Sequence, residues 1–165
     1  MTECPFSKKI FLFQDLDGQE VEEVLLGALE RDFSTGSVII REGEEGDSMF
    51  IMCQGEVEIT KRLTLELEED TPKERVMIRL KADDGVSFGE MALLESEARS
   101  ATVTALTQCR LLELGREEFL RLVHAHPETG VKLVIRLAQL LSRHLRKTNQ
   151  DVVKLTTALA IALGG

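Results

Sequence analysis

SFGEMALLESEARSATV, residues 87 to 103, is the stretch around which the rest of the chain is organised. It contains a turn glycine, Gly89, then the carboxylate of Glu90, a short apolar run, and Arg99 followed by Ser100. Unpaired backbone N–H groups at the start of a helical turn carry partial positive charge and can hold a phosphate. An arginine adds a permanent charge with paired donors, whereas a carboxylate accepts hydrogen bonds from sugar hydroxyls. The stretch therefore predicts a pocket for a ribose phosphate.

The pattern F-G-E-x-A-L-x, followed after a short loop by R-S-A, resembles the phosphate-binding cassette of the cyclic nucleotide-binding domain family. That family includes the bacterial catabolite activator proteins and the regulatory subunits of cyclic-nucleotide-dependent kinases. The resemblance implies that Glu90 binds the ribose 2′-hydroxyl and that Arg99 binds the cyclic phosphate. One departure is Ala98, which stands where the kinase-type cassette usually has proline. The alternative interpretation is that Glu90 and Arg99 form an ordinary surface salt bridge.

The region from Thr35 to Leu114 consists of short apolar or alternating runs separated by glycine and acidic turns, which indicates strands. The expected strands are 37–41, 49–53, 56–61, 75–80, 101–105 and 109–114. Strands at this spacing predict a β-sandwich or jelly roll, and the glycine pattern across Gly36 to Val57 again resembles the cyclic nucleotide-binding family. The expected class is therefore α+β, a β-roll with N-terminal helices and a long C-terminal dimerisation helix. We assign these glycines to turns that need positive φ.

Flanking helices are predicted on both sides of the roll. Residues 19–31 carry apolar side chains at helical spacing, with Asp17 as the expected N-cap. Residues 116–123 form a second amphipathic helix, and His126-Pro127 marks the break before a third. We therefore divide the chain into a roll domain with its flanking helices, residues 1–130, and a C-terminal helix, residues 131–165.

The C-terminal helix has apolar residues in a strict 4-3 alternation, which is the pattern of a coiled coil. This seam consists of Val134, Ala138, Leu141, Leu145, Thr148, Val152, Leu155, Leu159 and Ala162. A second stripe, Leu133, Leu137 and Leu140, is available to pack on the roll. At ~1.5 Å per residue the helix is too long to be covered by its own domain, so the sequence predicts a parallel homodimer.

The same helix is expected to complete the ligand site. In the catabolite activator protein, a Thr-Ser pair on the dimer helix covers the adenine of cyclic AMP, and by resemblance these positions fall on Thr148 and Asn149. A basic residue of that helix falls on His144. The alternative is that Thr148 only fixes the register of the coiled coil. The full set of expected ligand-binding residues is Gly89, Glu90, Met91, Ala92, Arg99, Ser100, Ala101, Thr148 and Asn149, with backbone donors around Ala92 and from Ser100 to Ala101.

Net charge, cysteine spacing and the lengths of the apolar runs argue against several classes of protein. The 165 residues carry a formal net charge of -9, which argues against a general nucleic-acid binder. The three cysteines have no C-x-x-C spacing and predict neither a disulfide framework nor a zinc site, and no apolar run is long enough for a membrane span. We therefore expect a cytoplasmic protein without metal or membrane. No catalytic motif is present, so no enzyme is expected.

The leading hypothesis is a stand-alone sensor of a cyclic nucleotide that signals to an unknown effector protein through its C-terminal helix. No DNA-reading element is expected after that helix. Cyclic AMP is preferred to cyclic GMP, because in the family a threonine directly after the arginine favours guanine and here Ser100 follows it. The first alternative is a scaffold or interaction protein that keeps the fold and has lost the nucleotide. Another anion, such as an organic acid or a haem carboxylate, is the second.

Overall fold

The computed structural model describes residues 9–62 and 74–164. Its elements in chain order are the 3₁₀ helix η2 (Phe11–Phe13), α1 (Gly18–Leu26), β1 (Leu29–Phe33), β2 (Val38–Ile40), β3 (Ser48–Gln54), β4 (Glu56–Arg62), β5 (Glu74–Lys81), the 3₁₀ helix η3 (Ala82–Asp84), β6 (Ser87–Phe88), α2 (Met91–Leu94), β7 (Thr102–Ala105), β8 (Cys109–Gly115), α3 (Arg116–Ala125) and α4 (Pro127–Gly164).

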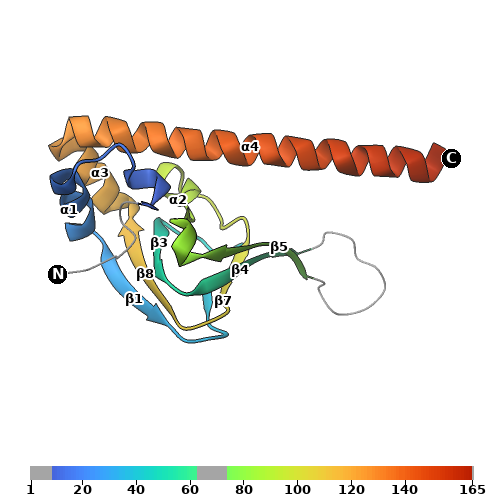
Figure 1. Cartoon of the computed structure of the whole chain (residues 1–165), viewed down its shortest axis with the longest axis horizontal. Coiled ribbons are helices and arrows are strands. Elements are labelled where there is room, and N and C mark those ends of the chain that lie inside the picture. Colours follow the sequence, from blue (N-terminus) through green and yellow to red (C-terminus); the bar gives the residue numbers. More distant parts are fainter. Residues whose placement is uncertain (1–8, 63–73, 165) are drawn as a thin grey trace.

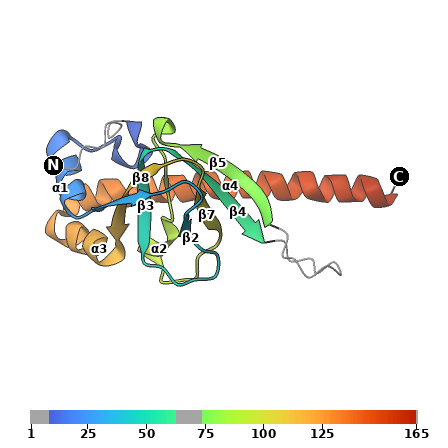
Figure 2. The ribbon, with the colours of Figure 1, turned by 90° about the horizontal axis from the view of Figure 1, so that it is seen from below.

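The strands form two four-stranded antiparallel sheets, with the orders β1-β8-β3-β6 and β2-β7-β4-β5. Helices η2, α1, α3 and the first half of α4 gather at one end of the roll, and α4 continues well past it (Figure 1). The turned view shows the same projection of α4 beyond the strands (Figure 2). The predicted α+β roll with a long C-terminal helix is confirmed.

Strand β3 is buried on both faces because it lies between two apolar cores. Met49, Ile51 and Cys53 point to a core shared with the helices, whereas Phe50 and Met52 point to a core between the two sheets. This division follows from the two-residue period of a strand. The first sheet is therefore the middle layer, with helices on one side and the second sheet on the other.

Helix α1 begins at the predicted cap. The Asp17 carboxylate accepts hydrogen bonds from the backbone N–H groups of Gln19 and Glu20. The Glu20 carboxylate in turn accepts a hydrogen bond from the Asp17 N–H. This reciprocal capping box satisfies donors that the helix leaves unpaired. The predicted end of the helix at residue 31 is wrong, because Gly27 ends α1 and residues 29–33 pair with β8 as strand β1.

Helix α4 is anchored on the roll by its first half. Leu133 and Leu137 of the predicted second stripe are fully buried. Lys132 Nζ lies 2.6 Å from Glu20 Oε1, and Arg136 Nε lies 2.6 Å from Asp15 Oδ2. The 38 residues of α4 span about 57 Å at 1.5 Å per residue, so most of the helix length lies beyond these contacts.

Two of the three cysteines lie in the described part of the chain and both are buried. Cys109 has a free thiol, whereas Cys53 is disulfide-bonded. The expectation of no disulfide is therefore wrong for Cys53, because spacing along the chain does not show which sulfurs the fold brings together.

Candidate functional site

The candidate site begins where β6 turns into the short helix α2. Gly89 makes this turn with φ of 78°, a conformation that side chains with a Cβ disfavour. A Cβ at Gly89 would also lie 2.9 Å from Arg99 Nη1 and 3.3 Å from the Ser48 carbonyl oxygen. Glycine is therefore required here both for the turn and for the close approach of Arg99.

The Arg99 guanidinium lies between two glycines and is held by Ser48. Its Nη1 donates to the Ser48 carbonyl oxygen at 2.7 Å, and its Nη2 donates to Ser48 Oγ at 3.3 Å. A Cβ on Gly46 would come within 2.1 Å of Arg99 Nε. The φ of Gly46 is not positive, so the expectation that this glycine serves a positive-φ turn is wrong. Its hydrogen instead gives the guanidinium space.

The backbone around Arg99 is paired with the loop that follows β2. The Arg99 N–H donates to the Glu44 carbonyl at 2.8 Å, and the Gly43 N–H donates to the Arg99 carbonyl at 2.9 Å. Ala98 forms an isolated antiparallel bridge with Glu45. Hydrogen bonding between these two loops therefore holds the cassette where the kinase-type pattern has proline.

Burial lowers the pKa of Arg99 below its ordinary value, while the carboxylates of Asp47 and Glu113 oppose this effect. An arginine stays charged even so, because its ordinary pKa is far above neutrality. The guanidinium has more N–H donors than the two bonds to Ser48 use. It can therefore offer charge and free donors to an anion from a partly desolvated position, where both are worth more than in water.

Glu90 is buried, with only 6% of its surface exposed, and it contacts the long helix. Its Oε1 lies 3.1 Å from Nδ1 of His144 on α4. The hydrogen bond to Glu90 raises the pKa of His144, while burial and the nearby Lys147 oppose the shift. The cassette is thus joined to α4 through the acceptor group that the sequence assigns to the sugar.

The structure brings together part of the predicted set of residues. Gly89, Glu90, Ala92 and Arg99 share one corner of the roll, and the Ala92 N–H donates to the Gly89 carbonyl at 3.2 Å. The remaining cassette residues lie nearer the surface, with Met91 and Ser100 exposed and Ala101 half-buried. Thr148 and Asn149 are exposed on α4 beyond His144.

Three residues of the site were not predicted from the sequence. Ser48 and Glu113 lie on strands far from the cassette in sequence, and Gly46 was assigned to a turn only. Ser48 Oγ donates to Glu113 Oε1 at 2.9 Å, so both are linked to Arg99. The resemblance to the cassette carried no signal for them, because each acts through a contact between distant segments.

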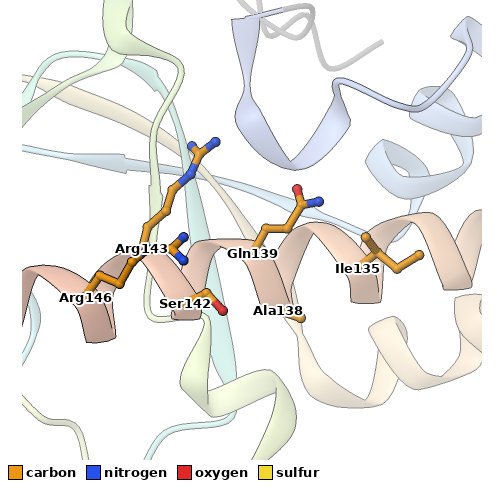
Figure 3. A pocket seen from close by; sticks show the side chains of 6 residues that line it. All are labelled: Ile135, Ala138, Gln139, Ser142, Arg143 and Arg146. Atoms are coloured by element: carbon orange, nitrogen blue, oxygen red, sulfur yellow. The ribbon is translucent and has the colours of Figure 1, made fainter.

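A separate cavity of about 550 Å³ lies along α4 (Figure 3). It is lined by Ile135, Ala138, Gln139, Ser142, Arg143 and Arg146. The Arg143 guanidinium carbon lies 4.1 Å from the centre of the Phe11 ring, a cation–π contact between α4 and η2. The lining comes from one helix and includes no cassette residue, so we do not assign the ligand site to this cavity.

The described part of the chain has neither a metal-binding cluster nor a membrane-spanning helix. Residues 9–62 and 74–164 contain no cluster of three or more potential metal-ligating side chains. Within the same ranges, no helix combines the length and the apolar character needed to cross a bilayer.

A buried carboxylate, Glu90, and an arginine held by Ser48, Arg99, thus lie in one segment of a β-roll. Comparison with known proteins identifies the family of this roll. A sequence profile described as the cyclic nucleotide-binding domain matches residues 30–126. The chain belongs to the cyclic nucleotide-binding domain family. This family is regulatory, so the part of the chain that matches it is a binding domain and not a catalytic one.

Three relatives show the range of proteins that contain such a domain. A cyclic nucleotide-gated potassium channel of Mesorhizobium japonicum is 36% identical over 71% of this chain and 29% of its own length. A CRP-like cAMP-activated global transcriptional regulator of Mycobacterium tuberculosis is 27% identical over 83% of this chain and 58% of its own. The crystal structure of Thermus thermophilus catabolite activator protein has a TM-score of 0.75 at 29% identity, over 88% of this chain and 63% of that one. The chain thus spans less than two thirds of each of these relatives.

Proposed function

We propose that this domain is a sensor of cyclic AMP that regulates an effector protein through α4. The observation that carries the proposal is that a buried carboxylate, Glu90, and a partly desolvated arginine, Arg99, lie in the same segment and next to a glycine turn. A buried carboxylate accepts hydrogen bonds and a guanidinium donates them, which suits a ribose hydroxyl and a cyclic phosphate respectively. A cAMP-activated regulator among the relatives supports the choice of ligand.

In this proposal Glu90 binds the ribose 2′-hydroxyl, and Arg99 binds the phosphate together with backbone N–H groups of Ala92, Ser100 and Ala101. Met91 and Gly89 shape the turn around the sugar. Cyclic AMP is preferred to cyclic GMP because Ser100 stands where a guanine-selective site has threonine. Both nucleotides belong in the test.

The adenine contact is assigned to Thr148 and Asn149. Thr148 lies four residues after His144, so both side chains are on the same face of α4, and His144 already reaches Glu90 of the cassette. Asn149 is rotated about 100° further round the helix. We therefore assign Asn149 to the site of the partner subunit in the proposed dimer.

The switching mechanism we propose is a difference in affinity between two positions of α4. A ligand that touches both the cassette and α4 stabilises the arrangement in which the two are close. The contact between His144 and Glu90 supports this because it shows that α4 is within hydrogen-bonding reach of the sugar-binding carboxylate. Residues 131–165 are then the signalling part of the chain.

The proposal includes a homodimer through the seam on α4. Five of the larger seam side chains are exposed in the single chain, whereas Leu141 is half-buried. Val134, Leu145, Val152, Leu155 and Leu159 are 42%, 62%, 54%, 59% and 58% exposed. Apolar residues that repeat every three to four positions on an uncovered helix favour pairing with a second helix. Polar Thr148 in the middle of the seam would also fix its register.

A ligand-free scaffold is the second candidate, and one observation favours it. The two groups assigned to the ligand already have partners within the chain, since Glu90 is bonded to His144 and Arg99 to Ser48. A nucleotide must displace or share these bonds. If these bonds exclude the nucleotide, the domain acts only as a scaffold for the assembly of the dimer.

Isothermal titration with cyclic AMP and cyclic GMP separates the two candidates. Saturable binding that is lost in Arg99→Ala and kept in Arg110→Ala supports the sensor. Arg110 is a matched control because it is a surface arginine that pairs with Glu30 and Asp32 on β1. Absence of heat up to about 1 mM, where binding is worth only ~4 kcal/mol, would refute the sensor and favour the scaffold.

A further inference from the structure

A chain of hydrogen bonds crosses the first sheet and ends at Arg99. It starts at the surface on β1, where Arg31 Nε donates to Glu113 Oε2 at 2.8 Å. The other carboxylate oxygen of Glu113, on β8, accepts from Ser48 Oγ at 2.9 Å, and Ser48 Oγ in turn accepts from Arg99 Nη2 at 3.3 Å. Four side chains from three neighbouring strands and the cassette loop are thus connected in series.

The register of the sheet explains why these side chains meet. Strand β8 lies between β1 and β3, and Glu113 pairs with Leu29 on one side and with Phe50 on the other. Arg31 and Ser48 each lie two residues from these partners, so they are diagonal neighbours of Glu113 on the same face. The contacts of Arg31, Glu113 and Ser48 are therefore built on regular strands, and Arg99 joins them from the cassette loop.

The direction of the bonds gives Glu113 a specific role. A serine hydroxyl has one proton, and here that proton is directed at the Glu113 carboxylate. The oxygen then presents a lone pair, which is the group that a guanidinium needs. Without a strong acceptor at Glu113 the hydroxyl is free to rotate, and its proton can turn toward the positive charge of Arg99.

We propose that Glu113 is a positioning residue for the phosphate-binding arginine: acting through the Ser48 hydroxyl, it holds the Arg99 guanidinium in the orientation that receives the ligand. Ser48 is buried and Glu113 is partly so, with 25% of its side chain exposed. At the surface end Arg31 pairs with Glu113, with 2.8 Å between Arg31 Nε and Glu113 Oε2. The inference rests on the proposed function only in the experiment that measures cyclic AMP binding.

The binding test compares an alanine and an amide at position 113. Glu113→Ala leaves Ser48 without its acceptor, and we expect cyclic AMP affinity to fall about tenfold, the usual weight of one hydrogen bond to a charged group. Glu113→Gln keeps an oxygen that accepts from Ser48, and its affinity should stay within about threefold of the natural chain. Glu30→Gln changes a surface carboxylate on β1, the neighbouring strand, and should leave cyclic AMP affinity unchanged.

The same comparison tests the route through Ser48. Ser48→Ala should weaken binding as Glu113→Ala does, and the double variant should bind no more weakly than Ser48→Ala alone, since residues acting in series are not additive. Additive losses, or equal affinities for Glu113→Ala and the natural chain, would overturn the inference.

A second readout does not depend on any ligand. Nitrogen-15 NMR spectra of the arginine side chains report the Arg99 Nε–H group, which is assigned by its absence in Arg99→Lys. In Glu113→Ala we expect this signal to exchange faster with water, and in Glu113→Gln to persist. An unchanged signal in Glu113→Ala overturns the inference. If the natural chain binds no cyclic nucleotide, the proposed function fails, while this spectrum still decides the role of Glu113.

Discussion

The two halves of α4 have the same kind of sequence and different surroundings. The first half buries Thr129, Gly130, Leu133 and Leu137 against the roll. From residue 142 to residue 164 every residue is exposed, although this half contains seven large apolar side chains. The first half is therefore stabilised by contacts within its own chain. The second half has apolar side chains that the described part of the chain leaves exposed.

This difference has a thermodynamic consequence. Contacts within one chain do not depend on protein concentration, whereas contacts between chains do. The anchored half and the cassette should therefore keep their structure in dilute solution. The exposed half should gain most of its stability on association.

The largest expected effect comes from charges placed in the exposed seam. Replacing Leu155 and Leu159 by lysine in both copies removes four leucines from the proposed interface. At about 1.5–3 kcal/mol for each buried leucine, the free energy of association loses about 6–12 kcal/mol. Sedimentation velocity should show the natural chain as a dimer and Leu155→Lys/Leu159→Lys as a monomer. The roll should stay folded, because both positions are exposed in the single chain.

Ile161→Lys is the matched control for the seam. Ile161 is 70% exposed and lies two positions after Leu159, about 200° round the helix. Its replacement should leave the dimer intact. A monomeric natural chain at about 100 µM, where a stable coiled coil is fully paired, would contradict the proposed self-association.

The second effect concerns the cassette. Gly46→Ala places a methyl group where Arg99 Nε now lies, so the guanidinium must move. Because the displaced guanidinium no longer points at the phosphate, we expect cyclic AMP affinity to fall about 10–100-fold, which is about 1.4–2.8 kcal/mol of binding free energy measured by titration calorimetry. The thermal midpoint should change little, because the displaced group is the end of a flexible side chain.

Gly115→Ala provides the comparison for Gly46→Ala, since a Cβ there meets nothing within 4 Å. Its affinity should match that of the natural chain. Equal affinities for the two alanine variants would show that the space around Arg99 is not limiting.

The smallest effect is the pH dependence of the contact between the cassette and α4. Glu90 raises the pKa of His144 above its ordinary value of 6.5. The ion pair therefore stabilises the folded chain fully below about pH 6.5, and this contribution is lost as pH rises through the higher pKa of the folded protein. Because 55% of the His144 side chain is exposed, the effect should be below about 1 kcal/mol.

Thermal unfolding at several pH values from 6 to 9 measures this contribution as the difference between the natural chain and His144→Gln. The two curves should converge as pH rises. His124→Gln, which leaves the Glu90 pair in place, should follow the natural chain at every pH. A constant gap between the natural chain and His144→Gln would show that His144 acts by packing and not by charge.

Most of the fold could be predicted from the sequence because its signals are local. The six expected strands are all present, and no strand end differs from its expected position by more than one residue. Strand β1 was missed because four of its five residues are exposed, so it lacks the alternation that marks a half-buried strand. Strand β6 has only two residues, too few for a periodic signal.

The site was predictable to the extent that it lies in one continuous segment. Glu90 and Arg99 are nine positions apart and belong to one recognisable pattern. Ser48 is 51 positions from Arg99 and 65 from Glu113. Only the pairing of β3 with β8 brings Ser48 and Glu113 together, and no pattern along the chain indicates this pairing. The clearance at Gly46 is hidden for the same reason.

The capping glutamate of α1 determines where α4 can move. The Glu20 carboxylate caps α1 and also binds Lys132, so the start of α4 cannot shift without disturbing another helix. In the proposed switch α4 pivots after Arg136, beyond the ion pairs of Lys132 with Glu20 and of Arg136 with Asp15, and the part of the helix that follows is the arm that moves. From Leu140 to Gly164 this arm is about 36 Å long, so a tilt of about 10° moves its end by about 6 Å. In the proposed switch, we therefore expect a rearrangement of one hydrogen bond at the cassette to produce a displacement as large as a side chain.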